Sequence, residues 1–176
     1  AKRIEHRDMG AKAELIEALA ASGTAVLNAD DPLVRSMAAR TDASVVLFGQ
    51  ADDADVQARR LEMDSTGRPS FDLCTPEGTA RVTLRYVGEH AVPNALAAAA
   101  VGRSQDMDVG TVAAALSQSE PQSRWRMEVT ERSDGLVVIN DAYNASPESV
   151  RAALKALKQI AGGRRCFAVL GQMREL

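Results

Sequence analysis

Hydrophobic positions near the start of the chain follow two periods in turn. The apolar residues of 11–19 recur at a helical spacing, whereas those of 24–27 and 44–48 form short unbroken runs that are typical of buried strands. Between these runs, an Asp-Pro pair opens 31–40 and suits the N-cap and first position of a helix. The order helix, strand, helix, strand predicts an α/β fold with a mostly parallel, doubly wound sheet.

The pattern changes after residue 50, where apolar and polar residues alternate. Three such stretches, 56–63, 71–75 and 81–87, are separated by turn sequences with Gly and Pro, and they predict antiparallel strands. Helical spacing returns at 92–102 and at 109–117. We therefore expect a parallel sheet accompanied by a small antiparallel sheet.

A polar stretch at 117–123 contains a proline and lacks periodicity, which makes it the best candidate for an interdomain linker. The elements predicted beyond it are strands at 126–131 and 136–140, a helix at 147–160 and a strand at 165–170. Together they describe a β-hairpin that leads into a β-α-β unit. The predicted division is one α/β domain over 1–120 and the first part of a second over 121–176.

The composition indicates a soluble protein whose core consists of Ala, Val and Leu. Of the 176 residues, 45% are hydrophobic and 3% are aromatic, and the net charge of -3 gives no reason to expect a nucleic acid or an anionic membrane as partner. No apolar run is long enough to span a membrane, and the charged N-terminus does not resemble a signal peptide. Cys74 and Cys166 lie far apart, so we expect two reduced thiols in a cytoplasmic protein.

The most informative segment is a predicted strand that runs directly into a polar turn and then a helix. The apolar run ends at Ile139, the turn contains Asp141, Tyr143 and Asn144, and the helix opens at Ser146. Polar side chains between the end of a strand and a helix N-terminus are where open α/β sheets bind ligands. The alternative is an ordinary turn whose Asx residues cap the helix, and spacing alone leaves both open.

A second polar pair stands at the start of the helix predicted from residue 92. His90 and Asn94 are four residues apart, so both side chains can point the same way. An amide both donates and accepts hydrogen bonds, which suits the edge of an adenine ring. The alternative is that these residues only cap or flank the helix.

Three further features have weaker signals. Asp30 and Asp31 follow Asn28 at the end of a strand, but neighbouring carboxylates on a turn often diverge and one can cap a helix, so neither is assigned a catalytic role. Arg126 follows the linker, where a solvated or ion-paired side chain is the ordinary outcome. Lys12 lies on an amphipathic helix, where a lysine is usually solvated.

The string INDAYNASPESVRAAL, which begins at residue 139, resembles the start of the C-terminal domain of the Mur ligase family. GEHAVPNALAAAA, LNADDP and RWRMEV resemble three further family motifs, and the likeness covers residues 11–176 but not 1–10. It implies the later part of a central ATP-binding domain followed by the start of a Rossmann-like C-terminal domain. The DAYNASP core is most similar to the family members that add D-alanyl-D-alanine to a UDP-muramoyl-tripeptide.

The resemblance also implies roles for individual residues. The residues it assigns are His90 and Asn94 on adenine, Arg126 on the nucleotide phosphates as a catalytic group, Asp141 on the ribose with Tyr143 and Asn144 beside it, and Lys12 as a carbamylated lysine near Mg²⁺. No metal ligand is assigned otherwise. The family's Asn after the motif histidine is replaced by Ala91.

By resemblance, we expect part of a monomeric cytoplasmic ligase that uses ATP and Mg²⁺. It would join D-alanyl-D-alanine to UDP-N-acetylmuramoyl-tripeptide through an acyl-phosphate. The 176 residues contain no Gly-x-x-Gly-Lys-Thr/Ser phosphate loop and no UDP-binding domain, so we expect the isolated chain to be an inactive fragment. The alternatives are a sister Mur ligase or folylpolyglutamate synthase-type enzyme, or a non-catalytic homologue that binds a nucleotide or a partner.

Overall fold

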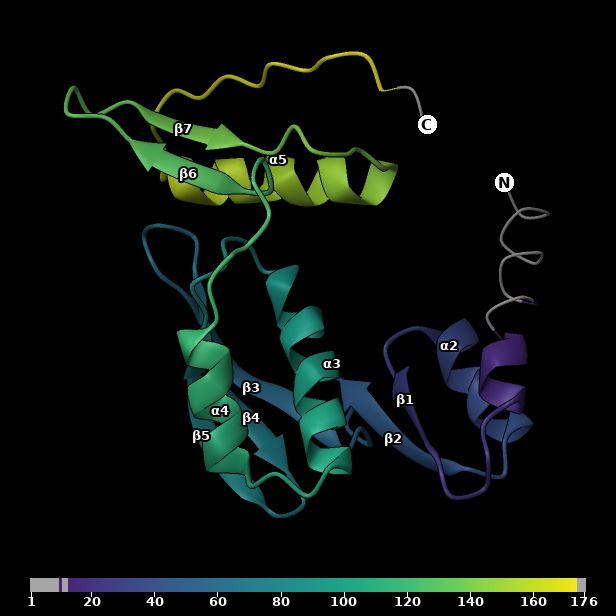
Figure 1. Ribbon diagram of the computed structural model, residues 1–176. Helices are drawn as coiled ribbons and strands as arrows, with labels where there is room; N and C mark the ends of the chain where they lie inside the picture. Colours follow the sequence, from purple (N-terminus) through teal and green to yellow (C-terminus); the bar gives the residue numbers. More distant parts are fainter. Residues whose placement is uncertain (1–9, 11–12, 174–176) are drawn as a thin grey trace.

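Five strands hydrogen-bond into one mixed sheet in the order β1-β2-β3-β4-β5 in this computed structural model, which describes residue 10 and residues 13–173 (Figure 1). The strands are β1 (Thr24–Asn28), β2 (Ser44–Gly49), β3 (Val56–Met63), β4 (Pro69–Thr75) and β5 (Gly78–Thr83). β1, β2 and β3 are parallel, while β3, β4 and β5 are antiparallel. The α/β fold is confirmed, and the structure adds that the parallel and antiparallel strands join through the pairing of Phe48 with Val56.

One face of the sheet is covered by two helices, α3 (Ala91–Ser104) and α4 (Val109–Gln118). Phe71 and Leu73 of β4 are fully buried against Val92 and Leu96 of α3. The alanines of α3 allow this close approach, because a side chain of one carbon lets the helix backbone lie near the strands. The main core therefore sits between α3, α4 and the antiparallel half of the sheet.

The opposite face is covered differently along its width. Over β1 and β2 it carries α2 (Pro32–Ser36), the 3₁₀ helix η1 (Met37–Arg40) and the helical residues 13–17, which enclose a second small core with Leu27. Over β4, Asp72 is only 5% exposed and forms ion pairs with Arg60 and Arg81. Hydrogen bonds from these two guanidinium groups hold the pKa of Asp72 below its ordinary value.

A smaller unit follows the segment after α4. It consists of the antiparallel hairpin β6 (Glu128–Glu131) and β7 (Val137–Asn140) with α5 (Pro147–Ala161) along one side (Figure 1). Met127 and Ile160 of this unit share a buried cluster with Val87, which follows β5. An ion pair of 2.5 Å joins Lys155 of α5 to Glu89, just before α3. These contacts set the hairpin unit against the start of α3.

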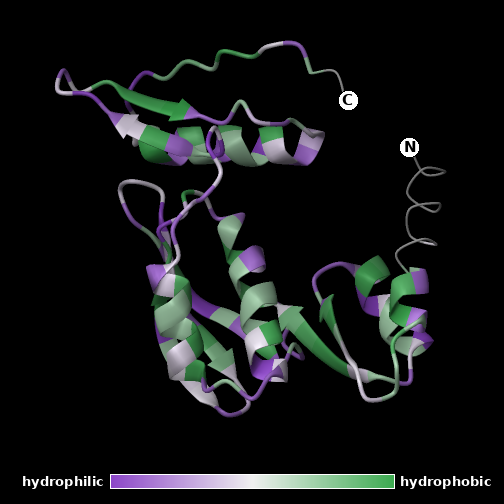
Figure 2. Cartoon of the chain, in the orientation of Figure 1, coloured by the Kyte–Doolittle hydropathy of each residue, from purple (hydrophilic) through white to green (hydrophobic). Residues whose placement is uncertain are grey.

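The predicted strand at 165–170 is wrong, because the structure has no regular secondary structure there. Its side chains are exposed, with Phe167 at 73% and Val169 at 95%, and Figure 2 shows this uncovered hydrophobic stretch near the C-terminus. An extended segment becomes a strand only when it pairs, and within the described residues no strand edge pairs with this one. The β-α-β unit expected there is therefore not formed.

Several strand boundaries also differ from the prediction, and two of them have a direct structural cause. β5 ends at Thr83, because the following residues turn away to contact the segment after α4. β6 begins at Glu128, because Met127 has a left-handed φ of 47° that takes the backbone out of the extended conformation. Among the described residues no helix is long and apolar enough to cross a membrane, and Cys74 and Cys166 are both free thiols.

Candidate functional site

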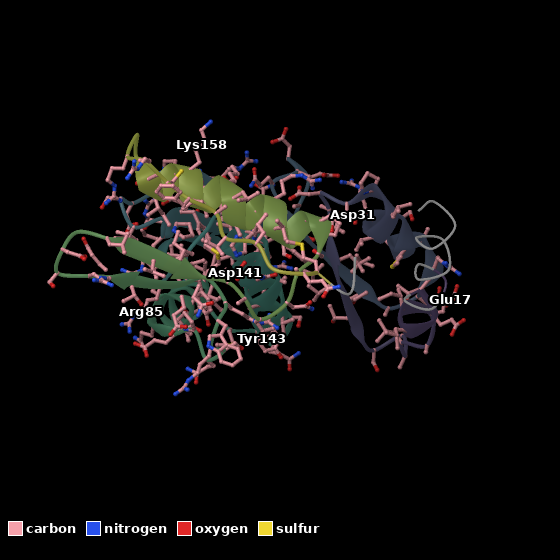
Figure 3. The ribbon with its side chains drawn as sticks, turned by 90° about the horizontal axis from the view of Figure 1, so that it is seen from above. Glu17, Asp31, Arg85, Asp141, Tyr143 and Lys158 are labelled. Carbon is pink, nitrogen blue, oxygen red and sulfur yellow. The ribbon has the colours of Figure 1, made fainter. Side chains whose placement is uncertain are left out.

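A cleft of ≈ 1110 Å³ lies where the hairpin unit meets the start of α3. Its lining contains six of the residues selected from the sequence, namely His90, Asn94, Arg126, Asp141, Tyr143 and Asn144. In Figure 3 Asp141, Tyr143 and Arg85, which also lines the cleft, lie in one region, while Glu17 lies far from them. Lys12, the remaining candidate, is outside the described residues. Side chains that are up to 54 positions apart in the sequence thus share one cavity.

The His90 side of the cleft depends on Gly88. Gly88 has φ +97°, and a Cβ added to it would lie 2.4 Å from Cε1 of the His90 ring. The imidazole is therefore folded against a turn that only glycine allows. His90 occupies the N-cap position of α3 without making a side-chain capping bond, so it does not serve as a conventional cap.

Asn94 lies one turn further along α3 and is exposed to the same cleft. The i, i+4 relation predicted from the sequence therefore holds, and both side chains reach one cavity. Ala91, between them, is 7% exposed and packs in the main core. A larger amide side chain at this position would need a buried hydrogen-bond partner, so the replacement by alanine suits the local packing.

The Arg126 side of the cleft has an unusual backbone. Trp125 and Met127 have φ of +62° and +47°, in the left-handed region that residues other than glycine rarely adopt. Met127 is 8% exposed and anchors the segment in the cluster with Ile160. Such conformations persist only where surrounding contacts determine them, and they are found preferentially at functional sites.

The contacts that fix this backbone come from the turn after β7. The Met127 amide donates to Asp141 Oδ1 at 3.0 Å, and the Tyr143 amide donates to the Trp125 carbonyl at 3.1 Å. Between these two links, the Arg126 guanidinium lies 4.2 Å from the centre of the Tyr143 ring. The connection between the units and the turn after β7 therefore form one wall.

The turn after β7 is not used to cap α5 with an Asx residue. Ser146 is the N-cap, and its hydroxyl accepts from the Ser149 amide at 3.1 Å while Ser149 Oγ accepts from the Ser146 amide at 2.8 Å. This reciprocal capping box satisfies the helix N-terminus. Asn144 Oδ1 accepts only from the neighbouring Ala145 amide, at 2.7 Å. Asp141 is thus committed to Met127 through one oxygen, and its cap role is excluded.

Sequence reasoning missed the arginine and tyrosine at the end of the β5 segment. Arg85 forms an ion pair with Glu120, and Tyr86 Oη donates to the Glu120 carbonyl at 3.1 Å. Both residues line the cleft and hold the start of the connection between the two units. No local pattern could have identified them, since their partners lie 34 and 35 positions away.

The Asn-Ala-Asp-Asp sequence after β1 has local structural roles. Asn28 Oδ1 accepts from the Asp30 amide at 2.9 Å, and Asp30 Oδ1 accepts from the Gln50 and Ala51 amides at 2.8 and 2.9 Å. Asp31 caps α2 by accepting from the Leu33 amide at 2.8 Å. Within residues 13–173, no group of three or more His, Cys, Asp or Glu could hold a metal ion. The two carboxylates therefore fix turns.

Comparison with known proteins gives two family matches. The Mur ligase middle domain matches residues 6–102, and the Mur ligase glutamate ligase domain matches residues 125–176. The expectation that residues 1–10 lie outside the family likeness is wrong for residues 6–10, which the first match includes. Between them the two matches leave out only residues 1–5 and 103–124.

Among curated relatives, the UDP-N-acetylmuramoyl-tripeptide--D-alanyl-D-alanine ligase of Mycobacterium tuberculosis is 49% identical over 94% of this chain and 33% of its own length. The UDP-N-acetylmuramoyl-L-alanyl-D-glutamate--2,6-diaminopimelate ligase of Geobacillus kaustophilus is 37% identical over 84% of this chain and 29% of its own. The chain spans about a third of the length of the curated relatives it matches.

Solved structures give the same picture. MurF from Acinetobacter baumannii has a TM-score of 0.76 and 29% identity, over 84% of this chain and 32% of that protein. MurF ligase from Thermotoga maritima, in complex with ADP, has a TM-score of 0.73 over 88% of this chain and 35% of that protein. At 24% identity the second likeness shows the fold alone.

Proposed function

Because the chain belongs to the Mur ligase family, we propose that its cleft holds the adenine nucleotide of an ATP-dependent peptide ligase. The observation that carries this proposal is the convergence of six chosen side chains on one cavity of ≈ 1110 Å³. In this arrangement His90 and Asn94 face the adenine, and Arg126 faces the phosphates. Asp141 offers its second carboxylate oxygen to the ribose hydroxyls, with Tyr143 and Asn144 beside it.

The chemistry of the side chains fits a nucleotide. The Asn94 amide can donate to and accept from the edge of a purine, and the exposed Arg126 guanidinium can donate paired hydrogen bonds to phosphate oxygens. The ribose hydroxyls are donors that a carboxylate accepts from, which suits Asp141. A cleft with a purine-binding wall and a cationic wall is therefore complementary to an adenosine phosphate.

We propose that the reaction joins D-alanyl-D-alanine to UDP-N-acetylmuramoyl-tripeptide, in the cytoplasm and as a monomer. The tripeptide carboxylate attacks the γ-phosphorus of ATP, which gives an acyl-phosphate and ADP. The amine of D-alanyl-D-alanine then attacks the acyl carbon and releases phosphate. Arg126 would stabilise negative charge on the transferred phosphoryl group through preorganised donors.

The relatives favour this acceptor over a single amino acid. Identity to the D-alanyl-D-alanine ligase of M. tuberculosis is 49%, against 37% to the diaminopimelate ligase of G. kaustophilus. The DAYNASP sequence within residues 141–147 agrees with this choice.

We propose that the chain comprises a partial central ATP-binding domain, residues 1–120, and the first part of a C-terminal domain, residues 121–176.

Mg²⁺ is part of the proposal only through Lys12, whose carbamate would act as a carboxylate ligand in the family scheme. Within residues 13–173 no carboxylate and imidazole cluster fits a metal ion. Lys12 is therefore the one residue that we propose as a ligand of Mg²⁺.

The first experiment titrates the chain with ATP and with adenosine while its amide resonances are observed. Binding that shifts the amide resonances of residues 88–94 and 125–144 supports the proposal. Asn94→Ala should lower the affinity for both ATP and adenosine. Arg132→Ala, a charge removal at the hairpin tip where Arg132 pairs with Asp134, is the control and should leave both affinities unchanged. Absence of any nucleotide binding by the wild-type chain would refute the proposal.

The acceptor is tested in the enzyme that carries this chain together with a phosphate loop. Phosphate release from ATP is measured with UDP-N-acetylmuramoyl-tripeptide and D-alanyl-D-alanine, and separately with UDP-N-acetylmuramoyl-dipeptide and diaminopimelate. Turnover only with the first pair supports the D-alanyl-D-alanine assignment. Turnover only with the second pair would refute this assignment and favour a diaminopimelate-adding sister ligase.

A further inference from the structure

The Tyr143 ring and the Arg126 guanidinium stack on each other inside the cleft, with 4.2 Å between Cζ and the ring centre. On the basis of the proposed function, we infer that Tyr143 is a positioning residue for Arg126. Its ring holds the guanidinium toward the nucleotide phosphates, and it acts through Arg126 instead of touching the nucleotide itself. This role is separate from those of Asp141 and Asn94.

The backbone around both residues keeps the stack in register. The Tyr143 amide donates to the carbonyl of Trp125, the residue before Arg126, at 3.1 Å. The residue after Arg126, Met127, donates its amide to Asp141 Oδ1 at 3.0 Å. Each partner of the stack is therefore flanked by a hydrogen bond to the other partner's segment, so the two backbones are held side by side where the ring and the guanidinium meet.

The kind of partner matters for what Arg126 can still bind. Among the described residues Arg126 forms no ion pair. Stacking uses the face of the planar guanidinium and leaves the N–H donors at its edge, and its positive charge, available to an anion. A carboxylate partner would instead occupy those donors and neutralise the charge.

Arg85, in the same cleft, provides the contrast. Its guanidinium donates to the Glu120 carboxylate through Nη1, so its charge is already balanced by an ion pair. The two arginines therefore have different roles. Arg85 fixes the start of the connection between the units, whereas Arg126 is oriented by stacking and keeps its N–H donors available. Of the two, the arginine without a carboxylate partner is the better suited to a ligand phosphate.

The test measures the affinities of the chain for ATP and for adenosine in five variants. Tyr143→Leu removes the ring face, Tyr143→Phe retains it, Arg126→Ala removes the cation, and Arg126→Ala/Tyr143→Leu removes both. Phe167→Leu removes a matched arginine–aromatic stack outside the cleft, where Arg165 lies 5.2 Å from the Phe167 ring centre. Adenosine lacks phosphates, so it reports on the purine and ribose contacts alone.

We expect Tyr143→Leu to weaken ATP binding by roughly threefold to tenfold, the range of a partly exposed cation–π contact, and to leave adenosine binding unchanged. Tyr143→Phe should keep the wild-type ATP affinity, because the phenyl ring offers the same face. In the Arg126→Ala background, Tyr143→Leu should cause no further loss. Phe167→Leu should behave as the wild type with both ligands.

Three results would overturn the inference while leaving the proposed function intact. They are an unchanged ATP affinity in Tyr143→Leu, an equal loss for ATP and adenosine, and a full additional loss in the double variant. The last two would place Tyr143 in direct contact with the nucleoside. If the wild-type chain binds neither ligand, the proposed function fails, and the inference fails with it.

Discussion

The amide of Met127 donates a hydrogen bond of 3.0 Å to Oδ1 of Asp141, across 14 positions of the sequence. We expect Asp141→Ala to lower the free energy of unfolding by about 1 kcal/mol, because the partly buried amide loses its acceptor. Asp141→Asn keeps an acceptor oxygen and should lose less. Urea unfolding of the two variants measures this difference, and equal losses would show that the hydrogen bond does not hold the segment.

Nucleotide binding by Asp141→Asn tests the proposed role of this carboxylate toward the ribose. Asp141→Asn replaces a charged acceptor by a neutral one and should weaken the binding of ATP and adenosine about equally, by roughly fivefold to tenfold, since a hydrogen bond to a charged group contributes about 1 kcal/mol more than one to a neutral group. Isothermal titration with both ligands checks it. A loss confined to ATP would instead connect Asp141 with the phosphates.

Gly88→Ala should displace the His90 ring. The added Cβ would lie 2.4 Å from its Cε1, and the backbone at φ +97° already disfavours alanine. We expect adenosine affinity to fall severalfold and stability to fall by about 1–2 kcal/mol. The control is Gly135→Ala, which has φ +82° and no atom within 4 Å of the added Cβ, so it carries the backbone strain alone. Adenosine affinity equal in the two variants would contradict the proposed place of His90.

Acid should weaken the contact between the β4–β5 turn and the end of α3. Arg103 donates to Glu77 at 2.8 and 3.0 Å, and these hydrogen bonds hold the pKa of Glu77 at about 2, below its ordinary 4.5. Since the folded pKa is the lower one, the stabilisation is complete above pH 4.5 and is lost as the pH falls toward 2.

The variants Glu77→Gln and Arg103→Met both remove this pair. Each should be less stable than the wild type at pH 7, and the difference should shrink as the pH falls from 4.5 to 2. Thermal unfolding across that range is the measurement. A stability difference that stays constant with pH would show that the pair does not supply the expected dependence.

Asp30→Ala should affect stability and not nucleotide binding. The substitution removes the acceptor of the Gln50 and Ala51 amides, and we expect a loss of about 1 kcal/mol. Asp52→Ala, whose side chain is 97% exposed, is the matched control and should stay within about 0.5 kcal/mol of the wild type. A marked fall in ATP affinity of Asp30→Ala, with stability intact, would argue for a direct role in the site.

The 176-residue polypeptide should show no phosphate release with ATP, UDP-N-acetylmuramoyl-tripeptide and D-alanyl-D-alanine. Its sequence contains no phosphate loop, and without one the positioning that supplies most of the rate acceleration in phosphoryl transfer is absent. A coupled phosphate assay measures this. Turnover above the buffer rate that Asn94→Ala abolishes would contradict the expectation.

Local patterns were sufficient for most elements of the fold. The helix that begins at Pro147 and the strand that begins at Thr24 follow from their own periods and caps. The predicted strand at 165–170 failed because extended structure depends on a partner edge, which the segment's own residues do not determine. The pairing of β2 with β3 at Phe48 and Val56 could likewise not be predicted, since it depends on two segments and not on the pattern of either one.

The same limit applies to the cleft. The i, i+4 spacing placed His90 and Asn94 on one side of a helix, and the family likeness selected Arg126 and Asp141. Neither source indicated that Tyr143 stacks on Arg126, because the two residues belong to different elements and meet only in three dimensions. Left-handed φ at a tryptophan and a methionine also has no sequence signature comparable to that of glycine.

The two units that line the cleft are joined by one short connection, between the end of α4 at Gln118 and the start of β6 at Glu128. Such a covalent tether gives each wall an effective concentration at the other on the order of millimolar. The contacts between the walls, including the Glu89–Lys155 ion pair, therefore do not have to hold two separate molecules together. The covalent connection keeps the two units together. The non-covalent contacts between them can therefore be weak enough to break and re-form around a ligand.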